Sequence, residues 1–93
     1  MYKVLYSHEY KKSYRRVFQQ VGFPEQKLKL YVDIISSGEN LPFSAHDHKL
    51  EGKLSCLRQC HLKGDLLLQY RIDEYLQIIT LVDIGTHHQL LGL

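Results

Sequence analysis

The spacing of apolar residues changes along the chain, and its first part has the spacing of helices. Residues 2–6 alternate as in a short strand, and Ser7 then offers a helix N-cap. Beyond it the apolar residues recur at three- and four-residue intervals, at Tyr10, Tyr14, Val17, Phe18 and Val21. This spacing places them on one face of a helix, which we expect to end near Gly22.

A second amphipathic helix is predicted directly after the first. Pro24 suits the first turn of a helix, and Gly38 suits its end. The apolar face between them carries Leu28, Tyr31, Val32 and Ile35. We expect the two helices to form a hairpin.

After Gly38 the pattern changes from helical spacing to strands. Residues 39–53 mix Asn, Pro and Gly with charged side chains and have no lasting period, which predicts a long loop. Strand-like runs follow at 54–62, 66–72 and 75–84, and the joints between them are too short for helical crossovers. We therefore expect an α+β fold, in which the N-terminal strand and the helical hairpin pack on an antiparallel sheet in the order β-α-α-β-β-β.

Alternation within the strands sorts their residues onto two faces of the sheet. In the middle strand, the face toward the helices is expected to carry Leu66, Leu68, Tyr70 and Ile72. In the last strand, the same face is expected to carry Leu76, Ile78, Val82 and Ile84. His61 and Asp65 then share the opposite, open face. Arg58 has inward parity, so it either reaches past the edge of the core or a bulge resets the strand there.

The two cysteines, Cys56 and Cys60, are predicted to be reduced and to point inward from one strand. Four residues of a strand separate Cα atoms by about 13 Å, whereas a disulfide needs less than about 7 Å.

Composition narrows the class of protein. The 93 residues suffice for one domain with one core, spanning residues 1–93, and 44% apolar with 24% charged residues are typical of globular proteins. The longest apolar runs fall far short of the about 20 residues of a membrane helix. The N-terminal residues lack the apolar core of a signal peptide, so we expect the chain to start here and to act in the cytoplasm.

Charge is unevenly distributed. Residues 1–63 contain eleven Lys and Arg against six Asp and Glu, whereas residues 64–93 contain one Arg against four acids. The outer side of the first helix carries Lys11, Lys12, Arg15 and Arg16. Such a surface can meet a phosphate backbone, although a charged outer stripe is also the ordinary way to solvate an amphipathic helix.

Histidines concentrate at the ends of the predicted strands. His48 lies in the loop, His61 ends one strand, Asp65 begins the next, and His87 follows the last. If the strands form a meander, these groups can converge on one open face. Because histidine has an ordinary pKa of about 6.5, two such rings can hold a proton acceptor and a proton donor near neutral pH. RNA cleavage needs this pair, a base for the 2′-hydroxyl and an acid for the departing 5′-oxygen.

The other histidines have a simpler interpretation. A single histidine on a loop or surface is most often a solvated side chain. We apply this interpretation to His8, His46 and His88.

Four short motifs follow one another along the second half of the chain. They are Asp-His-x-Leu-x-Gly at 47–52, Arg-x-x-His at 58–61, an Asp with a Leu-rich strand ending in Tyr at 65–70, and Gly-Thr-His at 85–87. Each motif alone is weak, but the four together, in order and with compatible spacing, are specific. In these motifs and their order, the chain resembles the YafQ-type toxins of the RelE superfamily over about half of its length.

The resemblance implies a ribosome-dependent endoribonuclease that cuts mRNA in the ribosomal A site, without a cofactor or metal. It implies an antitoxin partner, and contact with operator DNA only through the toxin–antitoxin complex. The family's catalytic residues correspond to His48, His61, Asp65 and His87. The resemblance assigns proton transfer to His48 and His87, makes Asp65 a base or an orienting group, and lets His61 support the phosphate.

The resemblance also implies contacts outside this set. Lys11, Lys12, Arg15 and Arg16 become candidates for docking on ribosomal RNA, and Arg58 and Leu91 for contact with the substrate. The chain departs from the family at two places. Where the family has Glu-Pro before the Asp, this chain has Lys63 and Gly64, and where it has Phe after the last histidine, this chain has Leu91. An aromatic ring can stack on a base for about 1–3 kcal/mol, which leucine cannot match.

Two alternatives remain open at the level of sequence. A non-enzymatic toxin of the ParE type, which acts on DNA gyrase, would have the same fold but no evident need for acid–base groups. A zinc-binding module would use Cys56, Cys60 and His61 with the pair His46 and His48 or the pair His87 and His88. Against it, the short Cys-x-x-Cys knuckle is missing, and Cys60 and His61 should face opposite sides of a strand.

Overall fold

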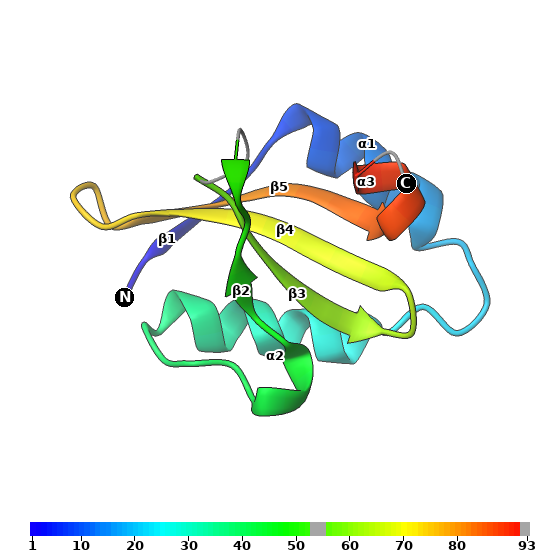
Figure 1. Cartoon of the computed structure of the whole chain (residues 1–93), viewed down its shortest axis with the longest axis horizontal. Helices are drawn as coiled ribbons and strands as arrows, with labels where there is room; N and C mark the ends of the chain where they lie inside the picture. Colours follow the sequence, from blue (N-terminus) through cyan, green and yellow to red (C-terminus); the bar gives the residue numbers. More distant parts are fainter. Residues whose placement is uncertain (53–55, 92–93) are drawn as a thin grey trace.

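A sheet with two helices on one face forms the body of the molecule (Figure 1). The computed structural model describes residues 1–52 and 56–91, the last of these by its backbone alone. In chain order the elements are β1 (Lys3–Tyr6), α1 (His8–Val17), α2 (Glu25–Ser36), the 3-10 turn η1 (Phe43–Ala45), β2 (His48–Lys49), β3 (Arg58–Lys63), β4 (Leu66–Asp73), β5 (Ile78–Thr86) and α3 (His87–Leu91). The predicted α+β class is confirmed.

The sheet is mixed rather than wholly antiparallel. Its strand order is β1-β5-β4-β3-β2. The meander of β3, β4 and β5 is antiparallel as predicted, but β1 joins it beside β5 and runs parallel to it. A parallel pair needs a long connection, and here the helices and the other strands lie between the two partners. The predicted loop 39–53 also contains structure, because η1 and the edge strand β2 lie within it.

Helix α1 begins where the sequence predicts and ends earlier. Ser7 is the N-cap, since its hydroxyl oxygen accepts a hydrogen bond from the backbone N–H of Tyr10 at 3.0 Å. The helix ends at Val17, and a turn then leads to Gly22, whose φ of 80° is left-handed. Val21 therefore lies outside the helix and is fully exposed, which corrects its predicted place on the apolar face.

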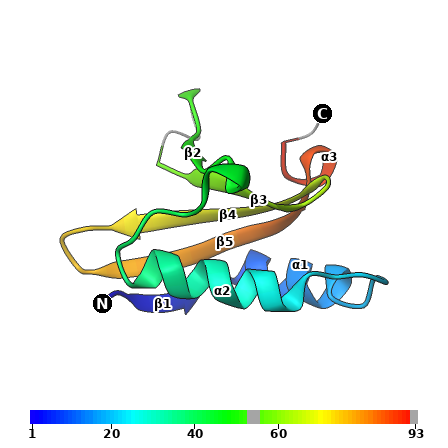
Figure 2. The same ribbon diagram turned by 90° about the horizontal axis from the view of Figure 1, so that it is seen from below.

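Helix α2 follows the prediction closely. Leu28, Tyr31 and Ile35 are buried, and Gly38 takes a left-handed φ of 84° just after the helix. Figure 2 shows that α1 and α2 cover one face of the sheet, whereas β2 and α3 lie on the other side. No helix among the described residues combines the length and the apolar character that a membrane span needs.

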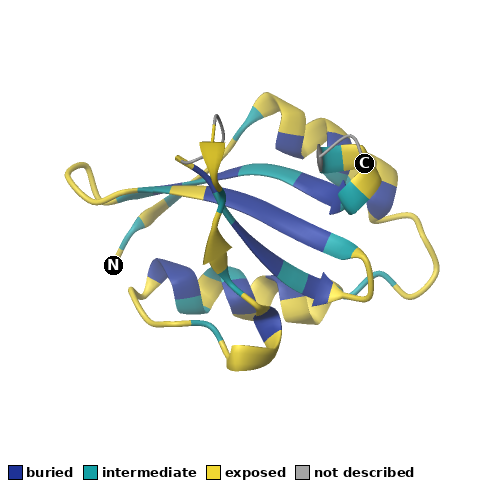
Figure 3. Cartoon of the chain, in the orientation of Figure 1, coloured by how far each residue is buried: buried dark blue, intermediate teal, exposed yellow. Residues whose placement is uncertain are grey.

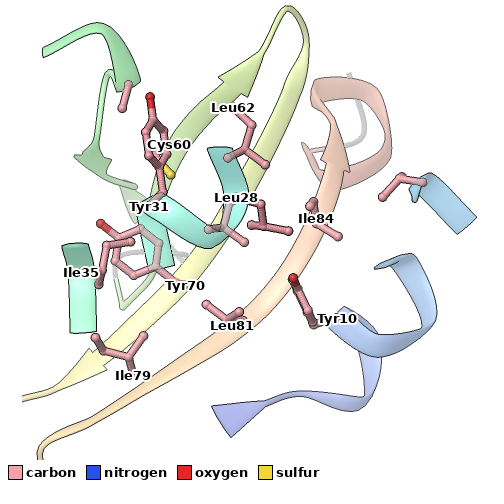
Figure 4. Close-up of a cluster of buried hydrophobic side chains, with 13 residues drawn as sticks. Tyr10, Leu28, Tyr31, Ile35, Cys60, Leu62, Tyr70, Ile79, Leu81 and Ile84 are labelled. Atoms are coloured by element: carbon pink, nitrogen blue, oxygen red, sulfur yellow. The ribbon is translucent and has the colours of Figure 1, made fainter. Parts of the chain in front are cut away.

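The core lies between these helices and the sheet. Figure 4 shows Tyr10 from α1 and three residues of α2 directed toward side chains of β3, β4 and β5. Burial of apolar surface of this kind is the main favourable contribution to folding. Cys60 is fully buried in this core, and burial raises the pKa of its thiol to about 12, so the thiol stays protonated.

The residues that β5 buries differ from the predicted ones. The register between β4 and β5 shifts between Gln69 and Tyr70, which is a β-bulge. As a result Ile79 and Leu81 are buried in place of the predicted Ile78 and Val82, while Leu76 lies in the preceding turn and is 58% exposed. Ile84, beyond the bulge, is buried as predicted.

The centre of β4 is buried on both of its faces, as Figure 3 shows for the middle of the sheet. Leu67 and Gln69 lie on the face predicted to be open and are nevertheless buried. The side-chain N–H of Gln69 donates to the side-chain oxygen of Gln59 at 3.3 Å, which gives each of these buried amides a hydrogen-bond partner.

Cys56 differs from the expectation, whereas Arg58 follows the first of the two alternatives predicted for it. Cys56 is exposed and precedes β3, so its predicted inward position is wrong, and both cysteines are free. The predicted strand start at 54–55 lies outside the described residues. Arg58 stays in register without a bulge, and it is half-buried in an ion pair with Asp47 at the edge of the core.

Candidate functional site

A row of histidine rings lies on the side of the sheet away from α1 and α2. The ring centroids of His46 and His61 are 5.3 Å apart, and those of His61 and His87 are 5.6 Å apart, both with edge-on geometry. These three residues come from the end of η1, from β3 and from the start of α3. The tertiary structure therefore brings together side chains that lie far apart in the sequence.

Strand geometry explains the place of His61. It follows Cys60, which points into the helix-side core, so alternation turns His61 to the opposite face. His48 pairs with Gln59 across β2 and β3, and the antiparallel register continued from this pair leads to His46 opposite His61. His46 itself has a left-handed φ of 48°, which turns the chain from η1 into β2.

His87 is held by Asp65. The Asp65 carboxylate, in the turn between β3 and β4, contacts the ring Nδ1 of His87 and also accepts from its backbone N–H at 3.4 Å. The hydrogen bond from His87 lowers the pKa of Asp65, with a contribution from the nearby His61. An ionised carboxylate can only accept hydrogen bonds, so we assign the proton of the His87 ring to Nδ1. Nε2 is then free to exchange a proton with a substrate.

Helix α3, which carries His87 at its first position, was not predicted. Its start is a capping box, in which Gln89 N–H donates to the Thr86 hydroxyl at 3.2 Å and Thr86 N–H donates to the Gln89 side-chain oxygen at 2.9 Å. A Cβ on Gly85 would lie 2.7 Å from that same oxygen, so the glycine leaves room for the Gln89 side chain that caps α3. The Thr-x-x-Gln spacing of residues 86–89 was the sequence signal for this helix.

His48 is exposed on β2 and its ring is also oriented. Its Nδ1 lies 2.7 Å from the backbone carbonyl oxygen of His46. Because a carbonyl only accepts, this contact assigns the proton to Nδ1 and leaves a lone pair on Nε2. Such a ring can act as a proton acceptor.

His61 lies in the middle of this group, and its surroundings favour the neutral ring. Burial lowers the pKa of His61, and the neighbouring His46, His87 and His48 lower it further, whereas Asp65 opposes them. The same interactions place His46, His48, Asp65 and His87 within electrostatic reach of His61.

In a pH titration followed by NMR, the ring of His61 is expected to titrate below its ordinary pKa of 6.5. Burial and like-charged neighbours penalise the protonated ring, so the neutral ring persists to lower pH and gains its proton only in more acidic solution. His46→Gln removes one of these neighbours and should raise the titration midpoint of His61, whereas His8→Gln, on exposed α1, should leave it unchanged. A wild-type midpoint at or above the ordinary value would contradict this assignment.

A second polar cluster supports the segment that carries His46 and His48. Asp47 accepts a hydrogen bond from the Tyr70 hydroxyl at 2.5 Å and from the Arg58 guanidinium at 3.1 Å. Tyr70 is 1% exposed and belongs to the core. Asp47 thus ties the loop before β2 to the sheet, a role that the sequence analysis did not predict.

The remaining predicted residues lie elsewhere. Helix α1 covers the face of the sheet opposite the histidine rings. Its predicted docking residues are all exposed, namely Lys11, Lys12, Arg15 and Arg16. Leu91 ends α3, and its side chain lies outside the described residues. His8, His46 and His88 are all exposed, as expected, and the ring of His46 also lies against that of His61.

The arrangement does not fit the zinc-binding alternative. Cys60 lies in the core on the helix side of β3, while His61 points to the other side, and Cys56 is exposed outside the strand. Among residues 1–52 and 56–91, no group of three or more histidine, cysteine or acidic side chains could hold a metal ion.

Comparison with known proteins identifies the family. The family model described as the bacterial toxin YafQ of type II toxin–antitoxin systems matches residues 2–92. A metal-bound toxin from Helicobacter pylori has a sequence 32% identical to this chain. The structural match covers 97% of this chain and 99% of that toxin chain, with a TM-score of 0.88. YafQ in the E. coli DinJ–YafQ complex is 25% identical, covers 99% of this chain and 100% of its own, and has a TM-score of 0.83.

A mutant of E. coli YafQ gives the same TM-score of 0.83 at 26% identity, over 99% of this chain and 100% of its own. No curated protein matches the sequence significantly. The structural matches confirm the expected RelE-like fold, with β1, two helices and then the strands of one mixed sheet. Since the family model spans all but the ends of the sequence, the chain belongs to the YafQ family of bacterial toxins of type II toxin–antitoxin systems.

Proposed function

We propose that this toxin is a ribosome-dependent endoribonuclease that cleaves mRNA by general acid–base catalysis. The observation that carries the proposal is the pair of His87 and Asp65 beside His61 on an accessible face of the sheet. An oriented imidazole next to further histidines can supply the general base and the general acid that 2′-hydroxyl attack on a phosphodiester requires. His48 and His87 bring to this face two rings whose Nε2 atoms are available for proton exchange.

The division of roles follows from the contacts of each ring. His48 takes the proton of the 2′-hydroxyl, whose oxygen then attacks the adjacent phosphorus. The bond from phosphorus to the 5′-oxygen breaks, and His87 gives that oxygen the proton of Nε2; for this step the ring carries a proton on both nitrogens, with Nδ1–H held by Asp65. His61, with its lowered pKa, supports the phosphate as a neutral hydrogen-bond donor rather than as a cation.

The proposed activity implies two kinds of partner, the ribosome and an antitoxin. The exposed positive charges of Lys11, Lys12, Arg15 and Arg16 on α1 suit docking on ribosomal RNA in the cytoplasm. E. coli YafQ forms a complex with DinJ. We extend this kind of partner to the present chain, which a cognate antitoxin would hold inactive and bring to operator DNA.

The competing function is inhibition of DNA gyrase by a ParE-like toxin of the same fold. Fold alone does not separate the two activities. The oriented pair of His87 and Asp65 favours the nuclease, since binding to gyrase has no need for acid–base groups.

The test is to add the purified chain to ribosomes that translate a defined mRNA and to map the new 5′ ends. We expect cuts in the ribosome-bound message and far fewer in the same message free in solution. A parallel assay measures DNA supercoiling by gyrase. Intact mRNA together with inhibited supercoiling would overturn the proposal in favour of the gyrase toxin.

A further inference from the structure

One phenylalanine is placed on the surface next to the histidine row. Phe43, the first residue of η1, is 93% exposed, although phenylalanine is ordinarily among the most buried residue types. Its neighbours give it a defined position, because Ala45 in the same turn is fully buried and His46 closes the turn with a hydrogen bond to the Phe43 carbonyl oxygen at 3.1 Å.

The Phe43 ring continues the row of histidines. Its centroid lies 6.0 Å from that of His46, and His46 in turn packs against His61. Ring faces and edges thus follow one another from the exposed Phe43 to His87, where the proposed proton donor lies. A strand of RNA held at His87 and His61 would pass Phe43 and His46 with its neighbouring nucleotide.

A pocket of about 490 Å³ opens beside this pair. This volume is within the range of small-molecule sites, so the pocket can take a nucleobase. Phe43, His46, His48 and Arg58 are among its lining residues. The pocket therefore combines aromatic rings, which stack on a planar base, with polar groups that can contact the base edge or the phosphate.

We propose that Phe43 and His46 form a stacking subsite for one base of single-stranded RNA, next to the phosphate that is cleaved. The inference rests on the proposed nuclease function and names a substrate contact within it. Phe43 supplies an aromatic ring to the site from η1, an element separate from β3 and α3, which carry His61 and His87. Every base has a π-face, so the subsite accepts many sequences.

The lining favours RNA over a protein partner. Five of the eight lining residues are polar or charged, namely Asn40, His46, Asp47, His48 and Arg58. The centre of a protein interface is ordinarily depleted of charge. Single-stranded nucleic acid combines an apolar base with an anionic backbone, which this lining can satisfy together.

A single-tryptophan reporter tests the stacking directly. The chain has no tryptophan, so Phe43→Trp introduces one fluorophore at the subsite. The matched control is Tyr75→Trp, because Tyr75 is also 93% exposed but lies in the turn between β4 and β5 at the far end of the molecule. Both variants carry His87→Ala to prevent cutting, and the probe is a single-stranded RNA oligonucleotide of mixed sequence at low salt. We expect RNA to quench the fluorescence of the Phe43→Trp protein and not that of the control. Equal quenching of both, or of neither, would overturn the proposal.

Cleavage of ribosome-bound mRNA gives the second readout. Phe43→Ala is expected to lower kcat/KM by about 5- to 150-fold, the usual effect of losing one base stack, while Tyr75→Ala stays near wild type. Phe43→Tyr keeps an aromatic ring and should lose less activity than Phe43→Ala. If the wild type cleaves and Phe43→Ala cleaves equally well, the subsite is wrong and the nuclease function stands. If Phe43→Ala leaves cleavage intact but weakens antitoxin binding, the ring is a protein contact and the proposal is overturned.

If the wild type cleaves no mRNA, the nuclease function fails. The RNA quenching experiment then decides the subsite on its own, with quenching confined to Phe43→Trp supporting it and its absence refuting it.

Discussion

The His87→Ala variant is expected to cleave ribosome-bound mRNA about a thousandfold more slowly than the wild type, since a positioned proton donor contributes about 10²- to 10⁴-fold. The reason is geometric. Asp65 and the capping box of α3 hold the His87 ring in one orientation, and alanine leaves no group there to protonate the departing oxygen. The measurement is the rate at which new 5′ ends arise in a translated message, or the growth arrest that follows induction without antitoxin.

Two further variants make this result specific to the site. Asp65→Asn keeps the shape of the side chain but allows the wrong tautomer of His87, and we expect a loss of about 10²-fold or more. His8→Ala, an exposed histidine on α1, should cleave at the wild-type rate. New cuts that appear equally in wild type and His87→Ala would show that this ring has no catalytic role.

The Asp47→Ala variant is expected to lower the free energy of unfolding by about 3 kcal/mol. The substitution leaves the buried Tyr70 hydroxyl without its acceptor and the half-buried Arg58 without its counter-charge. We place the value at the low end for a broken ion pair because the Arg58 side chain is 35% exposed and partly hydrated. Since a small domain is stable by only about 5–15 kcal/mol, this loss should be plain in urea denaturation.

A double-variant cycle assigns the cost to its source. In a Tyr70→Phe background no hydroxyl is left unsatisfied, so Asp47→Ala should cost less there than in the wild type. The matched control is Asp33→Ala on the exposed side of α2, which should change stability by less than about 0.5 kcal/mol. Equal costs for Asp47→Ala in both backgrounds would contradict a coupling between Asp47 and Tyr70.

Local sequence patterns were sufficient where one element decides its own structure. The N-cap at Ser7, the apolar stripe of α2 and the outward parity of His61 depend on neighbours within a few residues. Helical period, strand alternation and capping chemistry act over such distances, so the sequence alone carried them. The Thr-x-x-Gln box of α3 belongs to this class too.

Long-range packing decided the rest. Nothing near residues 3–6 specifies that β1 runs parallel to β5, and nothing near Gln69 and Tyr70 specifies the bulge that reverses the buried side of β5. These features arise from how whole elements pair, which local periodicity does not encode.

The candidate site shows the same division between sequence and tertiary structure. The sequence motifs predicted the candidate site residues His48, His61, Asp65 and His87. Only the tertiary structure added His46 and Phe43 to their row and tied the loop to the sheet through Asp47 and Tyr70. A ring contact or a hydrogen bond between distant segments depends on three-dimensional proximity, and the fold alone creates that proximity.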